Sequence, residues 1–452
     1  MNEHLLKYKI TPRVFEVGKI QKITVKGIDK SSVFFDDLTY IVTINQKDGW
    51  SYKKGEENTM YTRDFETRLE VKPQNGVITF EHFFSHETEW IINIAREKSD
   101  KHIPERYKKY WPYLADNMYR GFDFCVYSLN GDLYKKRPFK GDLHIHTYDS
   151  DGAESPEMVG AQYRKFGYDF ISITDHYVLK PSIDAIKSFE EIETGFKIFP
   201  GEEVHPIVNG VFHMVNFNPK ESVNEIISNN CEKTQAEVLE IAKNLDIQND
   251  EERMEIAWFS WIHDAIKKSG GICIYPHPYW VIFDSFNVHS FASEEIIKRG
   301  LCDCIEIIGG TDKKHNRMQV QFNYEMRDKG YRLPIIGTSD AHSTLVHGVS
   351  RFDQAWTVVF AENAEKIPEN ILKGFSAVVD NFDTDDKNVY GDLRQIKYIW
   401  FLIENYYELH DAYCNASGQA ILRYMLGDKS QKALISLLEA EVEKFNVEFF
   451  GF

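Results

Sequence analysis

The sequence predicts a mixed α/β protein in three parts: an all-β domain at residues 1–137, an α/β domain at residues 138–393 and a helical extension at residues 394–452. Three observations predict this organisation. Short β-branched and aromatic runs fill the first part, strands alternate with helices in the second, and aromatic-rich helical segments fill the third. Alternation of strands and helices is typical of a parallel sheet, open or closed.

In the first part, runs such as "IQKITVKGI", "LTYIVTIN" and "EWIINIARE" are separated by turn residues. They predict a small antiparallel sandwich. The stretch "QNG" between two such runs is a hairpin signal. This part contains no cluster of chemically reactive residues, so we expect it to support packing or to shape a substrate site.

In the second part, the predicted strands include "GDLHIHT", "YDFISITDH", "FKIFPGEEV", "GICIYPHP", "CDCIEIIGG" and "LPIIGTSDAH". A polar stretch at about 221–268, with apolar residues at helical spacing, interrupts the alternation and predicts an inserted helical segment. In the tail, "IKYIWFLIENYYELH" and "KALISLLEAEVEKF" predict helices packed on the core.

Composition narrows the class of protein. The formal charge of −17 argues against binding of long duplex nucleic acid. No apolar run is long enough to span a bilayer, and the first residues lack the pattern of a signal peptide. Six scattered cysteines do not form a disulfide framework. We therefore expect a reduced, cytoplasmic protein without a membrane partner, and its oligomeric state is left open.

Candidate site residues follow the predicted strands at the same position in each unit. In a parallel α/β barrel, the carboxyl ends of the strands form the active site, so these residues are expected to converge. Histidine, aspartate and glutamate together suit Zn²⁺, Mn²⁺ or Fe. The strand-end residues are His144 and His146, Asp175 and His176, Glu202 and Glu203, His277, and Asp340 and His342, and two further candidates, His213 and Glu306, lie within predicted strands.

Each residue alone also has an ordinary structural explanation. With 16 histidines in 452 residues, about half of one H-x-H pair is expected by chance. Asp175 could cap a helix, and His277 before a proline could belong to a turn. The joint pattern favours a metal site, because unpartnered buried charges at several separate strand ends would be costly.

As a set and in this order, "HIHTYDSDG", "SITDH", "PGEE", "FHMVNF", "YPHP", "IEI" and "GTSDAH" resemble the motifs of the PHP (polymerase and histidinol phosphatase) domain. The resemblance covers about residues 138–385. It implies a distorted (β/α)7 TIM-like barrel that holds up to three divalent metal ions (Zn, Mn or Fe).

The resemblance also implies a ligand set. The first metal takes His144, His146, Glu203 and Asp340, the second takes Glu203, His213 and His277, and the third takes Asp151, His176 and His342. The family pattern Pro-Gly-x-Glu favours Glu203 over Glu202, and Asp151 before Gly152 is favoured over Asp149. Both choices stay open here.

The functional hypothesis is a metal-dependent phosphoesterase that uses a metal-activated water on a phosphomonoester, a nucleotide or a short oligonucleotide. Glu203, His277 and Asp340 are the expected catalytic residues, and Lys180, His315 and Arg351 are candidate phosphate contacts. Two alternatives are a metal-stabilised binding or regulatory module without turnover, and a metal hydrolase acting on another bond type.

Overall fold

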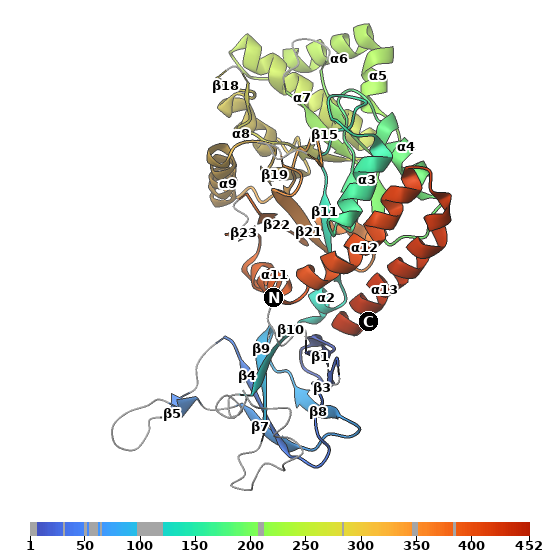
Figure 1. The fold of residues 1–452 in the computed structure, drawn as a ribbon. Helices are drawn as coiled ribbons and strands as arrows, with labels where there is room; N and C mark the ends of the chain where they lie inside the picture. The colour runs from blue at the N-terminus through green and yellow to red at the C-terminus, as the bar shows by residue number, and fades with distance from the viewer. Residues whose placement is uncertain are drawn as a thin grey trace. The chain divides into compact units, whose positions relative to one another are not determined.

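The computed structural model describes residues 7–29, 32–48, 52–53, 62–63, 66–96, 121–206, 212–282, 284–345, 351–382 and 386–452 (Figure 1). Contacts between Cα atoms divide the chain into two compact units. Unit 1 comprises Met1–Lys135, Lys397–His410 and Glu443–Phe452, and unit 2 comprises Lys136–Ile396 and Asp411–Val442. The C-terminal helices therefore contribute to both units.

Unit 1 contains two sheets around one core. The three-stranded sheet has the order β1-β3-β8 and the five-stranded sheet has the order β2-β10-β9-β4-β7. Alternate residues of β8, such as Ile78 and Phe80, are buried and meet Ile92 and Val126 of the other sheet in this core. The strands are β1 (Tyr8–Thr11), β2 (Val14–Glu16), β3 (Ile20–Gly27), β4 (Tyr40–Gln46), β7 (Thr67–Val71), β8 (Val77–Phe83), β9 (Thr88–Arg96) and β10 (Phe122–Leu129), with a short pair β5 (Tyr52–Lys53) and β6 (Thr62–Arg63) and a helix α2 (Gly131–Tyr134).

The "QNG" signal forms a turn but not the predicted hairpin. Asn75 and Gly76 have φ values of 53° and 75°, and Gln74 and Val77 exchange backbone hydrogen bonds across them. However, β7 and β8 on either side belong to different sheets. A tight turn fixes only its own residues, and the burial of the flanking strands decides which sheet each joins.

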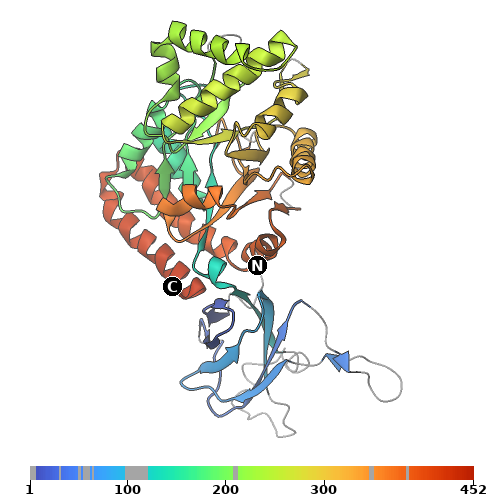
Figure 2. The same cartoon turned by 180° about the vertical axis from the view of Figure 1, so that it is seen from behind.

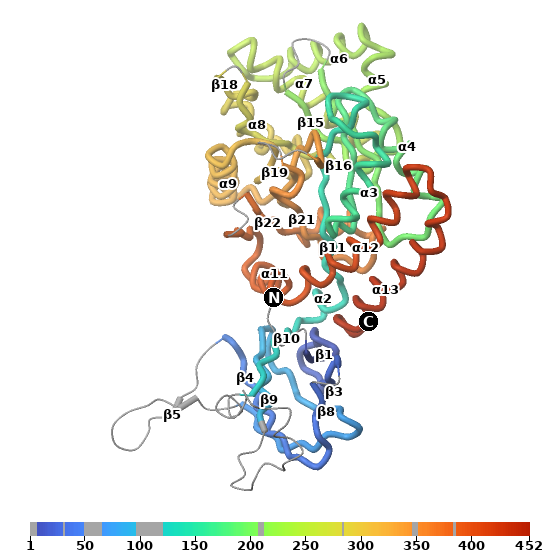
Figure 3. Tube along the Cα trace, in the orientation of Figure 1, coloured from blue at the N-terminus to red at the C-terminus, as the bar shows by residue number. Residues whose placement is uncertain are grey.

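Unit 2 is a mixed α/β structure with two larger sheets. One has the order β13-β12-β11-β21-β22-β23 and the other has the order β14-β15-β16-β19-β20. Figure 3 traces these strands along the chain. Their bounds are β11 (Arg137–Asp142), β12 (Phe170–Ser172), β13 (Lys197–Phe199), β14 (Gly201–Val204), β15 (Met214–Phe217), β16 (Ile272–Tyr275), β19 (Cys304–Ile308), β20 (Ile335–Gly337), β21 (Ala355–Ala361), β22 (Ser376–Asp380) and β23 (Asn388–Tyr390).

The parallel pairing predicted from the sequence is present only in part. Strands β11, β12 and β13 pair in parallel, as do β16, β19 and β20. In contrast, β15 is antiparallel to both β14 and β16, and β21 is antiparallel to β11. The connection from β14 to β15, residues 205–213, is shorter than the dozen or so residues that a parallel crossover needs.

Two isolated parallel bridges join the two sheets of unit 2. Ile145, after β11, pairs with Ala341, after β20, and His176, after β12, pairs with Glu203 in β14. Both bridges lie where predicted site residues follow the strands. They bring residues that are distant in the sequence next to one another.

Helices flank these sheets, and three of them form the insertion predicted at about 221–268 (yellow-green in Figures 1 and 2). The last of the three is α7, and Asn249 caps its N-terminus. The Asn249 side chain accepts hydrogen bonds from the backbone N–H groups of Glu251 and Glu252. Its Phe259, Ile262 and Ile266 recur at helical spacing and are buried.

The helix bounds are α3 (Pro156–Lys165), α4 (Lys180–Phe189), α5 (Val223–Asn229), α6 (Cys231–Lys243), α7 (Asp250–Lys268), α8 (Ser290–Lys298), α9 (Lys313–Asp328), α10 (Ile367–Leu372), α11 (Leu393–Asn405), α12 (Tyr407–Met425) and α13 (Lys432–Phe450). Short elements complete the chain: β17 (Val281–Ile282), β18 (Ser285–Phe286), η2 (Ala364–Lys366) and η3 (Lys429–Gln431). Within the described ranges, every helix is too short or too polar to cross a bilayer.

Candidate metal centre

The nine residues that the sequence places at a metal site come together at the strand ends of unit 2. They fall into overlapping groups whose potential ligand atoms lie within 4.8 Å of one another. Most of these side chains are buried, and several come from elements separated by more than 100 positions in the sequence. The nine residues are His144, His146, Asp151, His176, Glu203, His213, His277, Asp340 and His342.

Glu203 occupies the middle of the cluster. Its Oε1 lies 2.8 Å from Nε2 of His213 and 3.4 Å from Nε2 of His144. Its Oε2 lies 2.7 Å from Nδ1 of His176 and 3.5 Å from Nε2 of His146. Nε2 of His277 and Nε2 of His205 lie 3.9 Å from Oε1 and Oε2 respectively, so this one carboxylate faces three imidazoles on each oxygen.

Glu202 points to the opposite face of β14, as the alternation of a strand requires. Its carboxylate accepts hydrogen bonds from the backbone N–H of Val223 at 2.6 Å, the hydroxyl of Ser222 at 2.6 Å and the side-chain amides of Asn216 and Asn224. These partners lie in β15 and at the start of α5, so Glu202 fixes the insertion to the sheet. Of the two glutamates, Glu203 is the one within the cluster.

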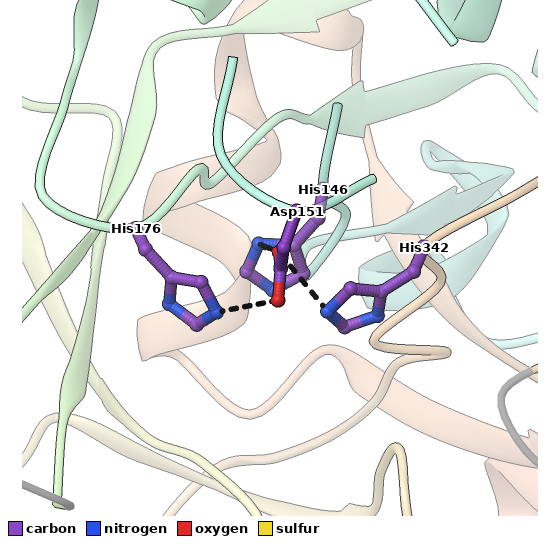
Figure 4. A group of neighbouring side chains, drawn as sticks. All are labelled: His146, Asp151, His176 and His342. Carbon is purple, nitrogen blue, oxygen red and sulfur yellow. Dashed lines mark ion pairs between the residues drawn. The ribbon is translucent and has the colours of Figure 1, made fainter. Parts of the chain in front are cut away.

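Asp151 forms an outer group with three histidines (Figure 4). Its carboxylate oxygens lie 3.2 Å from Nε2 of His342, 3.5 Å from Nε2 of His176 and 3.8 Å from Nδ1 of His146. Asp149 belongs to none of the potential ligand groups among the described residues, and its backbone N–H donates to the Thr147 hydroxyl. The loop after β11 thus directs Asp151, not Asp149, to the cluster.

Asp340 and His277 complete the inner part. Oδ1 of Asp340 lies 3.0 Å from Nε2 of His146 and 3.4 Å from Nε2 of His144, and Nε2 of His277 lies 3.0 Å from Nε2 of His213. Both residues have positive φ values, 24° at His277 and 50° at Asp340. Non-glycine residues rarely adopt this region, and such strain gathers at functional sites where the surrounding structure enforces it.

Glu306 and Asp175 are not in the proposed ligand set, but they form hydrogen bonds with residues of the cluster and of the loop beside it. Oε1 of Glu306 lies 2.9 Å from Nδ1 of His144, and its Oε2 accepts the backbone N–H of His277 at 3.0 Å. A proton on Nδ1 leaves Nε2 of His144 free to bind a metal. Asp175 accepts both the backbone N–H and the hydroxyl of Thr147 at 2.7 Å, which orders the start of the loop after β11.

Burial shifts the pKa of each group in this cluster toward its uncharged form, and neighbouring charges can reverse the shift. Burial alone would raise the pKa of Glu203, but His213 and His144 bring it well below its usual value. Burial lowers the pKa of His277 to about 4. Burial also lowers the pKa of His176, yet Asp151 and Glu203 raise it to about 10. Without a metal at neutral pH, Glu203 is therefore ionised and His277 neutral, as metal ligands must be, whereas His176 is protonated and must lose a proton before it can bind a metal.

The donor atoms fit divalent metal ions. Nε2 of His144, Nε2 of His146 and both oxygens of Glu203 are buried without an aligned hydrogen bond to any described residue. The imidazoles nevertheless approach Glu203 closely, so a divalent ion among them could contact nitrogen and oxygen donors together. Imidazole and carboxylate are the ligands that Zn²⁺, Mn²⁺ and Fe accept in proteins.

His205 also belongs to the cluster, although the sequence reasoning did not assign it there. Its Nε2 lies 2.9 Å from Nδ1 of His176, and it forms a potential ligand group with His176 and Glu203. The signal was present in the sequence: residues 203 and 205 have the same i, i+2 spacing as His144 and His146, which places both on one face of an extended chain.

The three candidate phosphate contacts have partners elsewhere. Lys180 forms an ion pair with Asp184 on the surface, and Nδ1 of His315 lies 3.0 Å from Asp312. Arg351 pairs with Asp353 and donates to the backbone carbonyl of Asn381. None of the three joins a potential ligand group among the described residues.

Three of the solved structures that resemble this chain are distant from it in sequence. One solved structure is a two-domain protein from Bacteroides vulgatus, described as containing a predicted PHP-like metal-dependent phosphoesterase. It is 18% identical to this chain, at a TM-score of 0.38 over 54% of this chain. The match spans 66% of that protein, just under two thirds of its length. A proposed metal-dependent phosphoesterase from Bifidobacterium adolescentis is 18% identical at a TM-score of 0.36, over 52% of this chain and 96% of its own.

An amidohydrolase from Chromobacterium violaceum, with bound sulfate and no metal, is 14% identical at a TM-score of 0.32, over 54% of this chain and 99% of its own. No family model matches the chain. No curated protein matches it either. Because the identities and TM-scores are low, any functional assignment rests on the residues of this chain.

Proposed function

We propose that this chain is a metal-dependent hydrolase of the PHP type that cleaves small phosphate esters. One observation carries the proposal: nine residues chosen from sequence motifs lie together at the strand ends of unit 2, around the carboxylate of Glu203. Chance placement of unrelated turn and core residues does not predict such convergence. The formal charge of −17 argues against long duplex nucleic acid, so the proposal is restricted to a small phosphorylated substrate, in the cytoplasm.

The same proposal includes the fold. The bridges Ile145–Ala341 and His176–Glu203 support closure of the two sheets of unit 2 into a distorted (β/α)7 barrel. In such a barrel the strand ends meet at one face, where active sites form. Antiparallel β15 is a departure from a regular barrel.

Two metal groups within the cluster follow the resemblance: His144, His146, Glu203 and Asp340 for one ion, and Glu203, His213 and His277 for another. Their contacts, between 2.8 and 3.9 Å, support this grouping. When bound, the ions supply a water nucleophile at neutral pH and stabilise the charge that develops on phosphate oxygens.

The protein's own residues prepare the site for this chemistry. Glu203 connects the two groups through its separate oxygens, and Glu306 keeps Nε2 of His144 directed toward them. Neutral His277 and ionised Asp340 present lone pairs without first losing a proton, since burial lowers the pKa of His277 and the neighbouring histidines outweigh burial to lower that of Asp340. The oxygen of the leaving alcohol takes a proton from water.

The test combines elemental analysis with an ester assay. The purified chain is loaded with Mn²⁺, Zn²⁺ or Fe²⁺, its bound metal is measured, and turnover is assayed on a panel of phosphomonoesters and nucleotides. We expect more than one metal per chain, and loss of turnover in Asp340→Ala and His277→Ala. His263→Ala is a matched control, since His263 lies on α7 and contacts Asp264, outside the cluster.

Each other outcome contradicts the proposal in its own way. Stoichiometric metal without turnover on any ester would indicate a metal-stabilised binding or regulatory module. Turnover on amides but not on phosphate esters would indicate a hydrolase of another bond type. Absence of metal from the wild-type chain would overturn the site itself.

A further inference from the structure

His205 extends the metal centre beyond the ligand set implied by the motifs. It follows the end of β14 by one residue, lies two residues after Glu203 and has only 7% of its surface exposed. Its backbone N–H donates to the side-chain oxygen of Asn224 at 3.3 Å, and the ring of Tyr177 lies against its imidazole with 4.3 Å between ring centroids. The side chain is therefore fixed where it meets Glu203.

Three atoms define the new group. Oε2 of Glu203 lies 2.7 Å from Nδ1 of His176, which lies 2.9 Å from Nε2 of His205, and the third side, from Nε2 of His205 to Oε2 of Glu203, is 3.9 Å. A circle through three atoms at these separations has a radius of about 2 Å, which is the length of a Zn–N or Zn–O bond. One ion can therefore contact all three atoms at once.

The other oxygen of Glu203 has a matching group. Oε1 lies 2.8 Å from Nε2 of His213, which lies 3.0 Å from Nε2 of His277, and the third side is 3.9 Å. The corresponding circle again has a radius of about 2 Å. Glu203 thus presents two groups of nearly equal dimensions, each made of one carboxylate oxygen and two imidazoles, and the motifs account for only one of them.

We propose that Glu203, His176 and His205 form a divalent metal site, with His176 binding through Nδ1. The inference rests on the proposed function in one respect, that the centre binds metal at all. Two imidazoles and one carboxylate suit Zn²⁺ or Fe²⁺ and leave positions open for water or a substrate oxygen.

This assignment changes the role of His176. A neutral imidazole has one unprotonated nitrogen, so His176 cannot give a lone pair through both Nδ1 and Nε2. Binding through Nδ1 leaves a proton on Nε2, which faces Oδ2 of Asp151 at 3.5 Å. The Asp151 carboxylate then accepts a hydrogen bond from Nε2–H of His176. In the motif-based grouping, by contrast, both residues bind the third ion.

A hydrogen bond between His205 and His176 is the competing explanation, because their 2.9 Å contact also satisfies hydrogen-bond geometry. The test therefore uses two substitutions in the full-length chain. His205→Ala removes the ligand and the hydrogen bond, whereas His205→Gln keeps an amide that can hydrogen-bond in place of Nε2 but binds metal poorly. His263→Ala is the control.

Each protein is stripped with a chelator, reloaded with Zn²⁺, dialysed and analysed for metal per chain, and visible absorption is recorded after reloading with Co²⁺. We expect both His205 variants to lose one ion relative to the wild type and to lose part of the Co²⁺ absorption. Their far-UV circular dichroism and the metal content of His263→Ala should match the wild type.

Full metal content in both His205 variants would overturn the inference and leave the proposed function intact. Full content in His205→Gln with loss in His205→Ala would also overturn it, since His205 would then act by holding His176. A wild-type chain without metal would instead refute the proposed function, and this site with it. Metal content thus separates the two failures without relying on activity.

Discussion

Substitution of Glu306 by glutamine tests whether the residues behind the cluster set its metal affinity. The Glu306 carboxylate is fully buried and accepts at both oxygens, from Nδ1–H of His144 at 2.9 Å and from the backbone N–H of His277 at 3.0 Å. Glutamine has one accepting oxygen and one donating amide group. One of the two donors must therefore face another donor.

Either orientation of the glutamine harms the site. With its amide group toward His277, the backbone N–H of that residue loses its acceptor, at a cost of about 1–3 kcal/mol for a buried group. With its amide group toward His144, the imidazole proton moves to Nε2, the atom that faces Glu203 and Asp340. We expect Zn²⁺ affinity to fall by about 10- to 100-fold, or roughly 1.4–2.7 kcal/mol.

Isothermal titration calorimetry with Zn²⁺, backed by chelator competition, measures this loss. Glu325→Gln serves as the control, because Glu325 is exposed on α9 and pairs only with Lys329 among the described residues. An affinity of the Glu306→Gln variant within about twofold of the wild type would refute the reasoning, since it would mean that the tautomer of His144 does not depend on this carboxylate.

Three further outcomes are expected. Asp151→Asn should lower the bound metal or its affinity while Asp149→Asn leaves both unchanged by elemental analysis, because only the Asp151 carboxylate reaches the histidines. Gly310→Ala should reduce metal content and cost about 1–3 kcal/mol in chemical denaturation, because its Cβ would lie 2.2 Å from Cβ of Asp340. Burial lowers the pKa of His82 in unit 1 to about 4, below its usual 6.5, so its contribution to stability is full above pH 6.5 and is lost as the pH falls toward 4. Unfolding of wild type and His82→Gln, followed from pH 7 to 4, should show a steeper loss in the wild type, and parallel curves would contradict this.

The residues that the sequence proposed as metal ligands lie together in the structure, and most of them are recognisable because they lie at or near strand ends. Most of the nine residues lie in or near apolar runs that are recognisable on their own, and the alternation of a strand fixes which neighbours share a face. That alternation also separates Glu202 from Glu203, although it cannot say which of them faces the histidines. The answer depends on Asn216, Ser222 and Val223, which surround Glu202 in the folded chain.

Other features depend on contacts that no local pattern contains. The direction of β15 follows from the short connection before it and from its burial between β14 and β16, not from its own residues. Likewise, the roles of Glu306 and His205 depend on His144 and His176, to which only the folded sheets bring them close.

By itself, the sequence determined which residue types stand at the strand ends, and hence that the chain can gather imidazoles and carboxylates for divalent metals. Only the tertiary structure decided how the donors are shared: three imidazoles face each oxygen of Glu203, and Asp151 instead of Asp149 belongs to the outer group. The physical reason is that strand periodicity is a local property, whereas distances between donor atoms are set by the pairing of strands far apart in the chain.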